Sequence, residues 1–341
     1  MIRSAVMKIA GLSFIALSLM MPPAASVAKT IEIKIGTLAP QGSSWIKAFH
    51  SIDAEVRGKT DKQVGLKIYP GGVLGDEKDM LRKMHIGQIH GAALTSAGLS
   101  AIFNEMDVFQ IPFLFESHHE VDYVIEKMEA FFKKGFDENG YILLGWSEAG
   151  FVHLMSTTPV ATLDDLRKAK VWTWADSPMT KVIFDQANVS AIPLSVPDVL
   201  VGLQTGLVNV VYAPPSGAIS LQWFTKIKYM TDVNLIYLIG GLVIQKKMFN
   251  KISPDHQKIL LETCRRRLNE LKTTIRQENQ EAIQVMVKHG VKIITSTPAQ
   301  VADFKKVSDQ AMQRLEGKSF SKKIREEVIT KIEAYRKKNP Q

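Results

Sequence analysis

The chain has 341 residues, 45% of them hydrophobic, and a formal net charge of +9. This length is enough for two globular domains, and the composition excludes a disordered or low-complexity protein. Cys264 is the single cysteine, which excludes an intrachain disulfide. We expect it to pack on a helix face.

The positive charge is concentrated in residues 241–341, where Lys and Arg outnumber Asp and Glu two to one. We expect these residues to form solvated helix surfaces, with a docking face for an acidic partner or anionic lipid as the alternative. Nucleic acid is not expected as a partner, because no aromatic residues are interleaved with the basic ones.

Residues 1–28 have the layout of a signal peptide. Arg3 and Lys8 precede an apolar run over residues 9–21, and Ser26-Val27-Ala28 forms a small-x-small cleavage site. The apolar run is shorter than the roughly 20 residues that a transmembrane helix needs. We therefore expect cleavage after Ala28 and a soluble product in the periplasm.

Three buried strands, separated by amphipathic helices, are predicted after the signal. They start at Ile31, Leu66 and His90, and the first helix carries Trp45. The third strand ends at the small residues Ser96 and Ala97. In open α/β sheets, ligands bind at the carboxyl ends of the strands. We therefore place the candidate site at this edge.

The rest of the sequence predicts a second half of the molecule, after which the chain returns to the first half. Strands are expected at 141–146, 170–174, 206–212 and 235–245, and a long helix is expected from about Asp255 to His289. Two chain crossings imply two lobes around a cleft, closing about Gly150 and Gly240. We assign residues 29–151 plus about 240–280 to lobe one. Residues 152–239 plus about 281–341 form lobe two.

This order of elements, with DVFQIPFLF at residues 107–115 and GWSEAGFVHLMS at residues 145–156, resembles the DctP-type family. These are the periplasmic solute-binding proteins of TRAP transporters. The resemblance covers nearly all of the mature chain. It implies an α/β, two-lobed periplasmic binding protein fold with crossover strands and a long helix shared by both lobes. It also implies a small-molecule ligand and delivery to a TRAP membrane permease driven by a sodium gradient, with no cofactor.

Catalytic motifs are absent from the sequence, which contains no GxSxG, HExxH, GxxxxGK[ST] or CxxC pattern. His118 and His119 are adjacent on a helix and cannot chelate a metal together, so we expect an exposed pair at a helix start. We predict no enzymatic activity and no metal. A less favoured alternative is an exported hydrolase that uses Glu148 and His153.

The polar groups that hold a carboxylate in the DctP-type family are replaced in this chain. Trp172 occupies the position of one family arginine, Val152 follows Gly-Phe where a second arginine often stands, and Tyr212-Ala213 replaces a polar pair before proline. Alternation along a strand sends Trp172 and Trp174 to the same face, so we expect an aromatic wall. These replacements favour a hydrophobic or amphipathic ligand. They also resemble the TRAP subgroup that works with a periplasmic tetratricopeptide-repeat protein.

The predicted ligand-binding residues are Trp45, Ser96, Ala97, Phe151, Val152, Trp172, Trp174, Leu194, Tyr212 and Ala213. An alternative keeps an organic acid as the ligand, with Lys170, Arg82 or His153 supplying the cation. A sensor subunit that presents its liganded form to a receptor is a further alternative.

Overall fold

The computed structural model describes residues 30–175 and 177–340. The predicted signal peptide and its cleavage site lie outside the described residues. Within those two ranges, the helices include none that is both long and apolar enough to cross a membrane.

The first part of the chain alternates strands and helices, as its apolar pattern predicts. These elements are β1 (Ile31–Thr37), α1 (Ser44–Lys59), β2 (Val64–Tyr69), α2 (Glu77–His85), β3 (Gly91–Thr95), α3 (Ser96–Ser100), the 3-10 helix η1 (Asn104–Gln110) and α4 (His118–Glu138). Helix α2 begins with a capping box, in which the Asp76 side chain accepts from Glu77 N and Asp79 reaches back to the Asp76 backbone.

The middle of the chain contains the predicted second half. Its elements are β4 (Tyr141–Ser156), α5 (Leu163–Lys168), β5 (Val171–Trp174), α6 (Pro178–Ala187), β6 (Ala191–Leu194), η2 (Val196–Asp198), α7 (Val199–Thr205), β7 (Val210–Ala213), α8 (Pro215–Ser220), η3 (Trp223–Thr225), β8 (Tyr229–Thr231) and β9 (Ile236–Gln245).

The last part is mostly helical. It consists of α9 (Lys246–Phe249), α10 (Pro254–Lys288), β10 (Lys292–Ile294), α11 (Pro298–Leu315) and α12 (Lys322–Lys338). Ser253 caps α10 by accepting from His256 N, and Pro254 occupies the first turn, where its missing N–H removes no helical hydrogen bond. Cys264 is buried on α10, as expected.

Within the described ranges, ten strands form one continuous sheet with the order β2-β1-β3-β9-β4-β7-β5-β6, while β8 pairs with β4 and β10. Strands β1, β2 and β3 are parallel, as are β5, β6 and β7. Strand β9 runs antiparallel between β3 and β4. The α/β fold with crossover strands and a long shared helix is therefore confirmed.

Strand β4 belongs to both halves of the sheet. Its residues Tyr141 to Val152 pair with β9, and His153 to Ser156 pair with β7. The register shifts between Glu148 and Gly150, and Gly150 has a φ of +104°. A bulge of this kind bends a strand and changes its twist, which suits the point where β4 passes between the halves.

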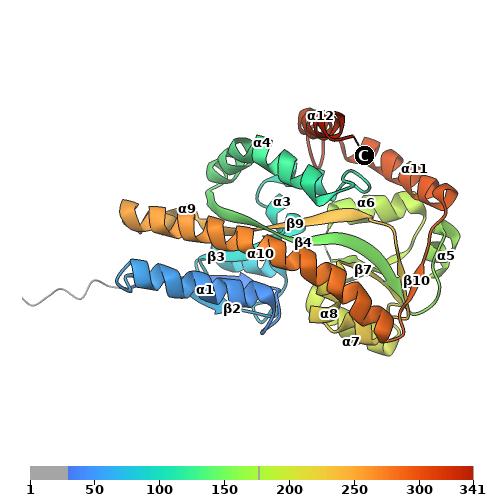
Figure 1. The fold of residues 1–341 in the computed structure, drawn as a ribbon, viewed down its shortest axis with the longest axis horizontal. Helices are drawn as coiled ribbons and strands as arrows, with labels where there is room; N and C mark the ends of the chain where they lie inside the picture. The colour runs from blue at the N-terminus through green and yellow to red at the C-terminus, as the bar shows by residue number, and fades with distance from the viewer. Residues whose placement is uncertain (1–29, 176, 341) are drawn as a thin grey trace, which may run out of the picture.

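Helices cover both faces of the sheet (Figure 1). Helix α10 crosses the whole molecule on the face that α1 also covers, while α4 and α12 lie on the opposite side. Phe132 of α4 packs against Phe109 of η1 and Trp146 of β4. Because α12 packs on α4, the end of the chain contacts the part assigned to lobe one, although we expected it in lobe two. The other lobe boundaries stay a prediction.

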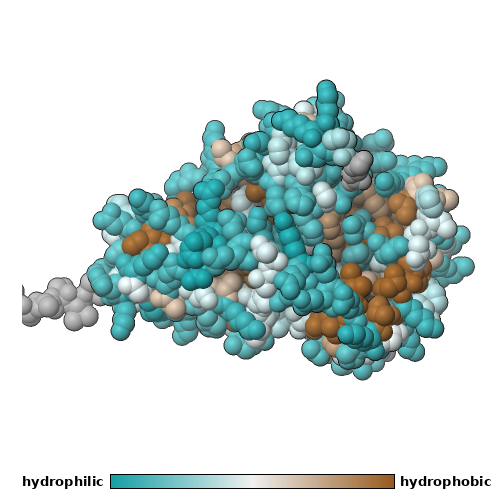
Figure 2. Space-filling view, in the orientation of Figure 1, coloured by the Kyte–Doolittle hydropathy of each residue, from teal (hydrophilic) through white to brown (hydrophobic). Residues whose placement is uncertain are grey.

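Most of the face shown in Figure 2 is hydrophilic, including the surface of α10, and hydrophobic residues gather over α7 and α8. Some basic residues of α10 form ion pairs, since Arg266 and Arg267 both contact Glu55 on α1. Hydrogen bonding from Arg266 lowers the pKa of Glu55 to about 2. These charges link helices as well as facing solvent.

We predict that Gly150→Ala destabilises the fold more than Gly140→Ala. Both glycines have positive φ, +104° and +82°. A Cβ at 150 would lie 2.5 Å from Asn279 Nδ2, whereas a Cβ at 140 meets nothing within 4 Å. We expect losses in the free energy of unfolding of about 2–4 kcal/mol for Gly150→Ala and about 1 kcal/mol for Gly140→Ala. Urea denaturation measures both, and equal losses would contradict the role of the bulge.

Candidate ligand-binding cavity

A cavity of about 160 Å³ lies between the two halves of the sheet. Its walls come from the carboxyl ends of β1 and β3 on one side and of β5 and β7 on the other. The middle of β4 and β9 lies between them. This is the edge at which ligands bind in open α/β sheets.

An aromatic wall closes one side of the cavity. The Trp172 and Tyr212 rings stack with centroids 4.7 Å apart, and Trp174 lies 6.1 Å from Trp172. Trp223 meets the Trp172 ring edge to face at 5.3 Å. Trp172 Nε1 donates to the Leu194 carbonyl at 3.1 Å, and Tyr212 Oη accepts from Trp174 N at 3.3 Å. These hydrogen bonds engage the polar atoms of Trp172 and Tyr212 within the protein.

Asp76 joins the two halves across the cavity edge. It caps α2 in the first half, and its Oδ2 accepts from Trp174 Nε1 at 3.0 Å and from Val196 N at 2.9 Å in the second half. One carboxylate therefore satisfies donors from both halves, and it orients the Trp174 ring.

Glu77, the next residue, is a buried carboxyl group that lines the cavity. Its Oε1 accepts from Thr95 N at 2.6 Å, and its Oε2 accepts from the Thr95 hydroxyl at 2.9 Å. Burial raises the pKa of Glu77 to about 7, despite the opposing effect of these hydrogen bonds.

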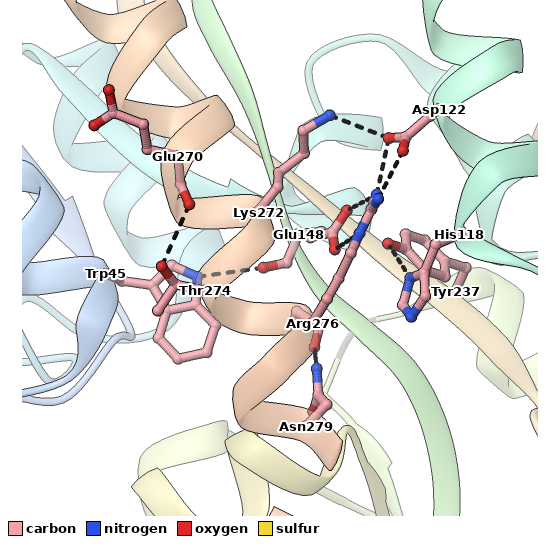
Figure 3. A network of polar contacts seen from close by, with 11 residues as sticks. Trp45, His118, Asp122, Glu148, Tyr237, Glu270, Lys272, Thr274, Arg276 and Asn279 are labelled. Carbon is pink, nitrogen blue, oxygen red and sulfur yellow. Dashed lines mark hydrogen bonds and ion pairs between the residues drawn. The ribbon is translucent and has the colours of Figure 1, made fainter. Parts of the chain in front are cut away.

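Glu148 also lines the cavity, and Arg276 neutralises its carboxylate (Figure 3). Arg276 Nε donates to Glu148 Oε1 at 2.7 Å, and its two terminal nitrogens donate to Asp122 at 2.7 and 2.8 Å. Lys272 adds a contact to Asp122 at 3.1 Å. Two cations thus balance two carboxylates.

Trp45 and Tyr237 flank this ion-pair network on opposite sides (Figure 3). Trp45 Nε1 donates to the Glu148 carbonyl at 3.3 Å. Tyr237 Oη lies 3.0 Å from His118 Nδ1, and burial, followed by the charge of Glu148, raises the pKa of Tyr237. His118 is therefore half-buried and not exposed as expected, because Tyr237 and Phe151 pack against its ring.

The structure brings half of the predicted site residues together at the cavity. Those that line it are Trp45, Trp172, Trp174, Tyr212 and Ala213. The others are placed elsewhere: Ser96 and Ala97 lie in α3, Phe151 packs on His118, Val152 lines a second cavity, and Leu194 contributes its carbonyl to Trp172. That the five lining residues contact a ligand stays a prediction.

The three cations considered for an organic acid all lie away from the cavity wall. Arg82 is exposed and pairs with Asp79, and Lys170 is exposed and donates to the Gly206 carbonyl. His153 is buried with Nδ1 3.1 Å from the Thr231 carbonyl, and burial lowers its pKa. Among the described lining residues, none is Lys, Arg or His.

The sequence reasoning missed Glu77, Ser147 and Trp223, which line the cavity, and Asp76, which accepts a hydrogen bond from the lining residue Trp174. The sequence shows Asp76 and Glu77 only as an acidic helix start, so their position beside the cavity leaves no separate signal. Trp223 lies in a short 3-10 helix, outside any regular periodicity. In the described part of the chain, no group of three His, Cys, Asp or Glu residues is placed to hold a metal ion.

The model of the DctP family, described as bacterial extracellular solute-binding protein family 7, matches residues 35–319. The chain belongs to this family. Among similar solved structures is the sugar acid binding protein DctPAm from Advenella mimigardefordensis in complex with galactonate. It superposes with a TM-score of 0.84 at 20% identity, covering 90% of this chain and 99% of that one. This similarity shows the two-lobed fold of TRAP periplasmic solute-binding proteins.

Two curated relatives carry the names of acids. The 2,3-diketo-L-gulonate-binding periplasmic protein of Escherichia coli is 27% identical over 77% of this chain and 81% of its own length. The C4-dicarboxylate-binding periplasmic protein of Rhodobacter capsulatus is 21% identical over 82% and 84%. These names, with the galactonate complex, contradict the hydrophobic ligand expected from the sequence and favour the organic-acid alternative.

We predict that Asp76→Ala removes more stability than the loss of a helix cap alone. The substitution leaves Trp174 Nε1 and Val196 N without their acceptor, in addition to uncapping α2. We expect the free energy of unfolding to fall by about 2–3 kcal/mol. Thr162→Ala is the matched control, because it removes the capping box of α5, at about 1 kcal/mol. Equal losses would show that the bridge between the halves adds nothing.

We predict that Glu77 makes the stability of the folded chain depend on pH. The pKa of Glu77 is about 7 in the folded chain against an ordinary value of 4.5. The folded state therefore holds more protons between these values, and its stability falls as pH rises from 4.5 to 7. We expect Glu77 to lower the free energy of unfolding by at most about 3 kcal/mol across this range. Urea denaturation across this range should show a smaller decrease for Glu77→Gln than for the wild type. The exposed Glu138→Gln should leave the decrease unchanged.

Proposed function

We propose that this chain is the periplasmic solute-binding subunit of a TRAP transporter and that its ligand is an organic acid. The observation that carries the proposal is the position of the cavity. It lies between two halves joined by β4, β9 and α10, at the carboxyl ends of strands from both halves. Such an arrangement suits capture of a small molecule by closure of the halves.

The charge balance of the cavity is compatible with an acid. Arg276 neutralises Glu148, and Glu77 is largely protonated below pH 7 because its pKa is about 7. The wall therefore carries little net negative charge to repel a carboxylate. Thr37, Ser147 and Ser220 also line the cavity, and hydroxyl groups donate hydrogen bonds to carboxylates.

The aromatic wall favours an acid with a planar or apolar body. Trp174 and Tyr212 are half-buried and present ring surface whose burial against a ligand contributes about 25 cal/mol per Å² removed from water, while Trp172 stacks on Tyr212 and is already buried. Extensively hydroxylated acids would leave their hydroxyls against these rings without partners. We therefore place the carboxylate near the hydroxyl groups that line the cavity and the body of the acid against Trp174 and Tyr212.

We also propose that the protein is exported to the periplasm after removal of residues 1–28 and delivers its ligand to TRAP membrane permease subunits. A tetratricopeptide-repeat partner stays a prediction, as does the absence of enzymatic activity. In support of the latter, Glu148 and His153 are each engaged by another group, Arg276 and the Thr231 carbonyl.

Calorimetry on the mature protein tests the ligand class. The panel contains aromatic carboxylates, short keto acids, sugar acids and the neutral amide of each. We expect saturable binding of at least one aromatic or keto acid and no binding of its amide. Affinity should rise as pH falls from 8 to 6 in the wild type, because Glu77 loses its charge, and this dependence should be absent in Glu77→Gln.

For the acid that binds, Trp174→Ala should weaken affinity by about 1–3 kcal/mol, because it removes the apolar contact of a half-buried ring that lines the cavity. Phe131→Ala, on the exposed side of α4, is the control and should leave affinity unchanged. The proposal is wrong if the amides bind as tightly as the acids, or if only uncharged apolar molecules bind.

A further inference from the structure

A second cavity of about 110 Å³ lies in the second half of the molecule. Strand β4 provides Val152 and Leu154, α5 provides Leu166, and α6 provides Met179 and Phe184. Helix α11 and the segment after η1 complete the lining with Phe304, Val307, Pro112 and Phe113. Its walls are therefore almost wholly aliphatic and aromatic.

The few polar side chains around this cavity have hydrogen-bond partners within the protein. Gln110 donates to Asp107, Ser308 donates to the Pro112 carbonyl, and the Thr180 hydroxyl contacts that of Thr173. Tyr212 Oη accepts from Trp174 N. A buried water needs two to four polar partners, and cavities without them stay dry and bind apolar molecules.

Tyr212 is shared by the two cavities. It lines both of them, with its ring stacked on Trp172 on one side and 6.2 Å from Phe184 on the other. The cavity containing Val152 thus lies directly behind the aromatic wall of the main cavity.

Phe113, on the wall of this cavity, has a strained backbone conformation. Its φ is +60°, a left-handed conformation that is unfavourable for a bulky residue, and its N–H donates to the Leu235 carbonyl at 2.7 Å. Backbone strain of this kind often accompanies functional sites. Here it places an aromatic ring on the cavity wall, with Lys305 Nζ 5.9 Å from the ring centroid.

We propose that the cavity between β4, α5, α6 and α11 is a second binding site, which takes a small apolar group the size of xenon or a benzene ring. The group comes either from a separate apolar molecule or from the tail of an acid that reaches past Tyr212. The first source does not depend on the function proposed above, whereas the second rests on it.

The decisive experiment is crystallography of the wild-type mature protein under xenon pressure. We expect xenon between Leu154, Leu166 and Phe184. Titration with fluorobenzene, followed by ¹⁹F NMR, gives a second measurement in solution. Ala187→Leu fills the cavity from α6 and should weaken fluorobenzene binding at least tenfold. Ala302→Leu makes the same change at an exposed position of α11 and should leave binding unchanged.

Absence of xenon from the cavity would overturn the proposal, as would fluorobenzene binding that Ala187→Leu does not alter. The xenon result needs no variant, so it decides the matter even where Ala187→Leu does not fold. Competition then identifies the source of the group. Displacement of fluorobenzene by hexanoate but not by acetate indicates a tail that passes Tyr212, and displacement by neither indicates a separate molecule.

These outcomes are independent of the calorimetric test of the main cavity. Xenon can occupy the second cavity of a protein that binds no acid, and an acid can bind beside Trp174 while the second cavity remains empty. The failure of one proposal is therefore distinguishable from the failure of the other.

Discussion

Arg276 forms ion pairs with two carboxylates, those of Glu148 and Asp122, and the arrangement of the molecule depends on this interaction. A buried carboxylate such as Glu148 is tolerated in the middle of a sheet only with a well-placed cation. Arg276 provides it and also pairs with Asp122 on α4. Asn279, nearly one turn further along α10, donates to the Ala149 carbonyl and accepts from Ser216 N. One helix thereby fixes the bulged centre of β4 relative to α4 and α8.

This constraint shapes the cavity in both geometry and charge. Because β4 and α10 are held together at the bulge, the strand ends of both halves face the same space, and Asp76 can bridge from α2 to Trp174. The same pairing removes the charge of Glu148 from the cavity wall. What remains is a nearly neutral pocket whose lining includes four tryptophans and Tyr212.

Much of the fold could be predicted from the sequence, because strand alternation and helix caps act over a few residues. The strands, the long helix and the shared face of Trp172 and Trp174 belong to this part. Val152 was placed at the site because it stands where a family arginine often follows Gly-Phe, whereas in the structure it lines the second cavity. His118 was taken as exposed because Tyr237, which covers it, lies 119 residues away in the chain.

The sequence by itself determined the secondary structure, the two-lobed α/β fold and the family, since these depend on local patterns and on their order. Only the tertiary structure decided that Glu77 is buried with a pKa near 7, that Asp76 bridges the halves and that Arg276 neutralises Glu148. These properties arise from desolvation and from partners 18 to 128 residues apart. Local propensity does not reveal such partners, because they come together only when the whole sheet and α10 pack.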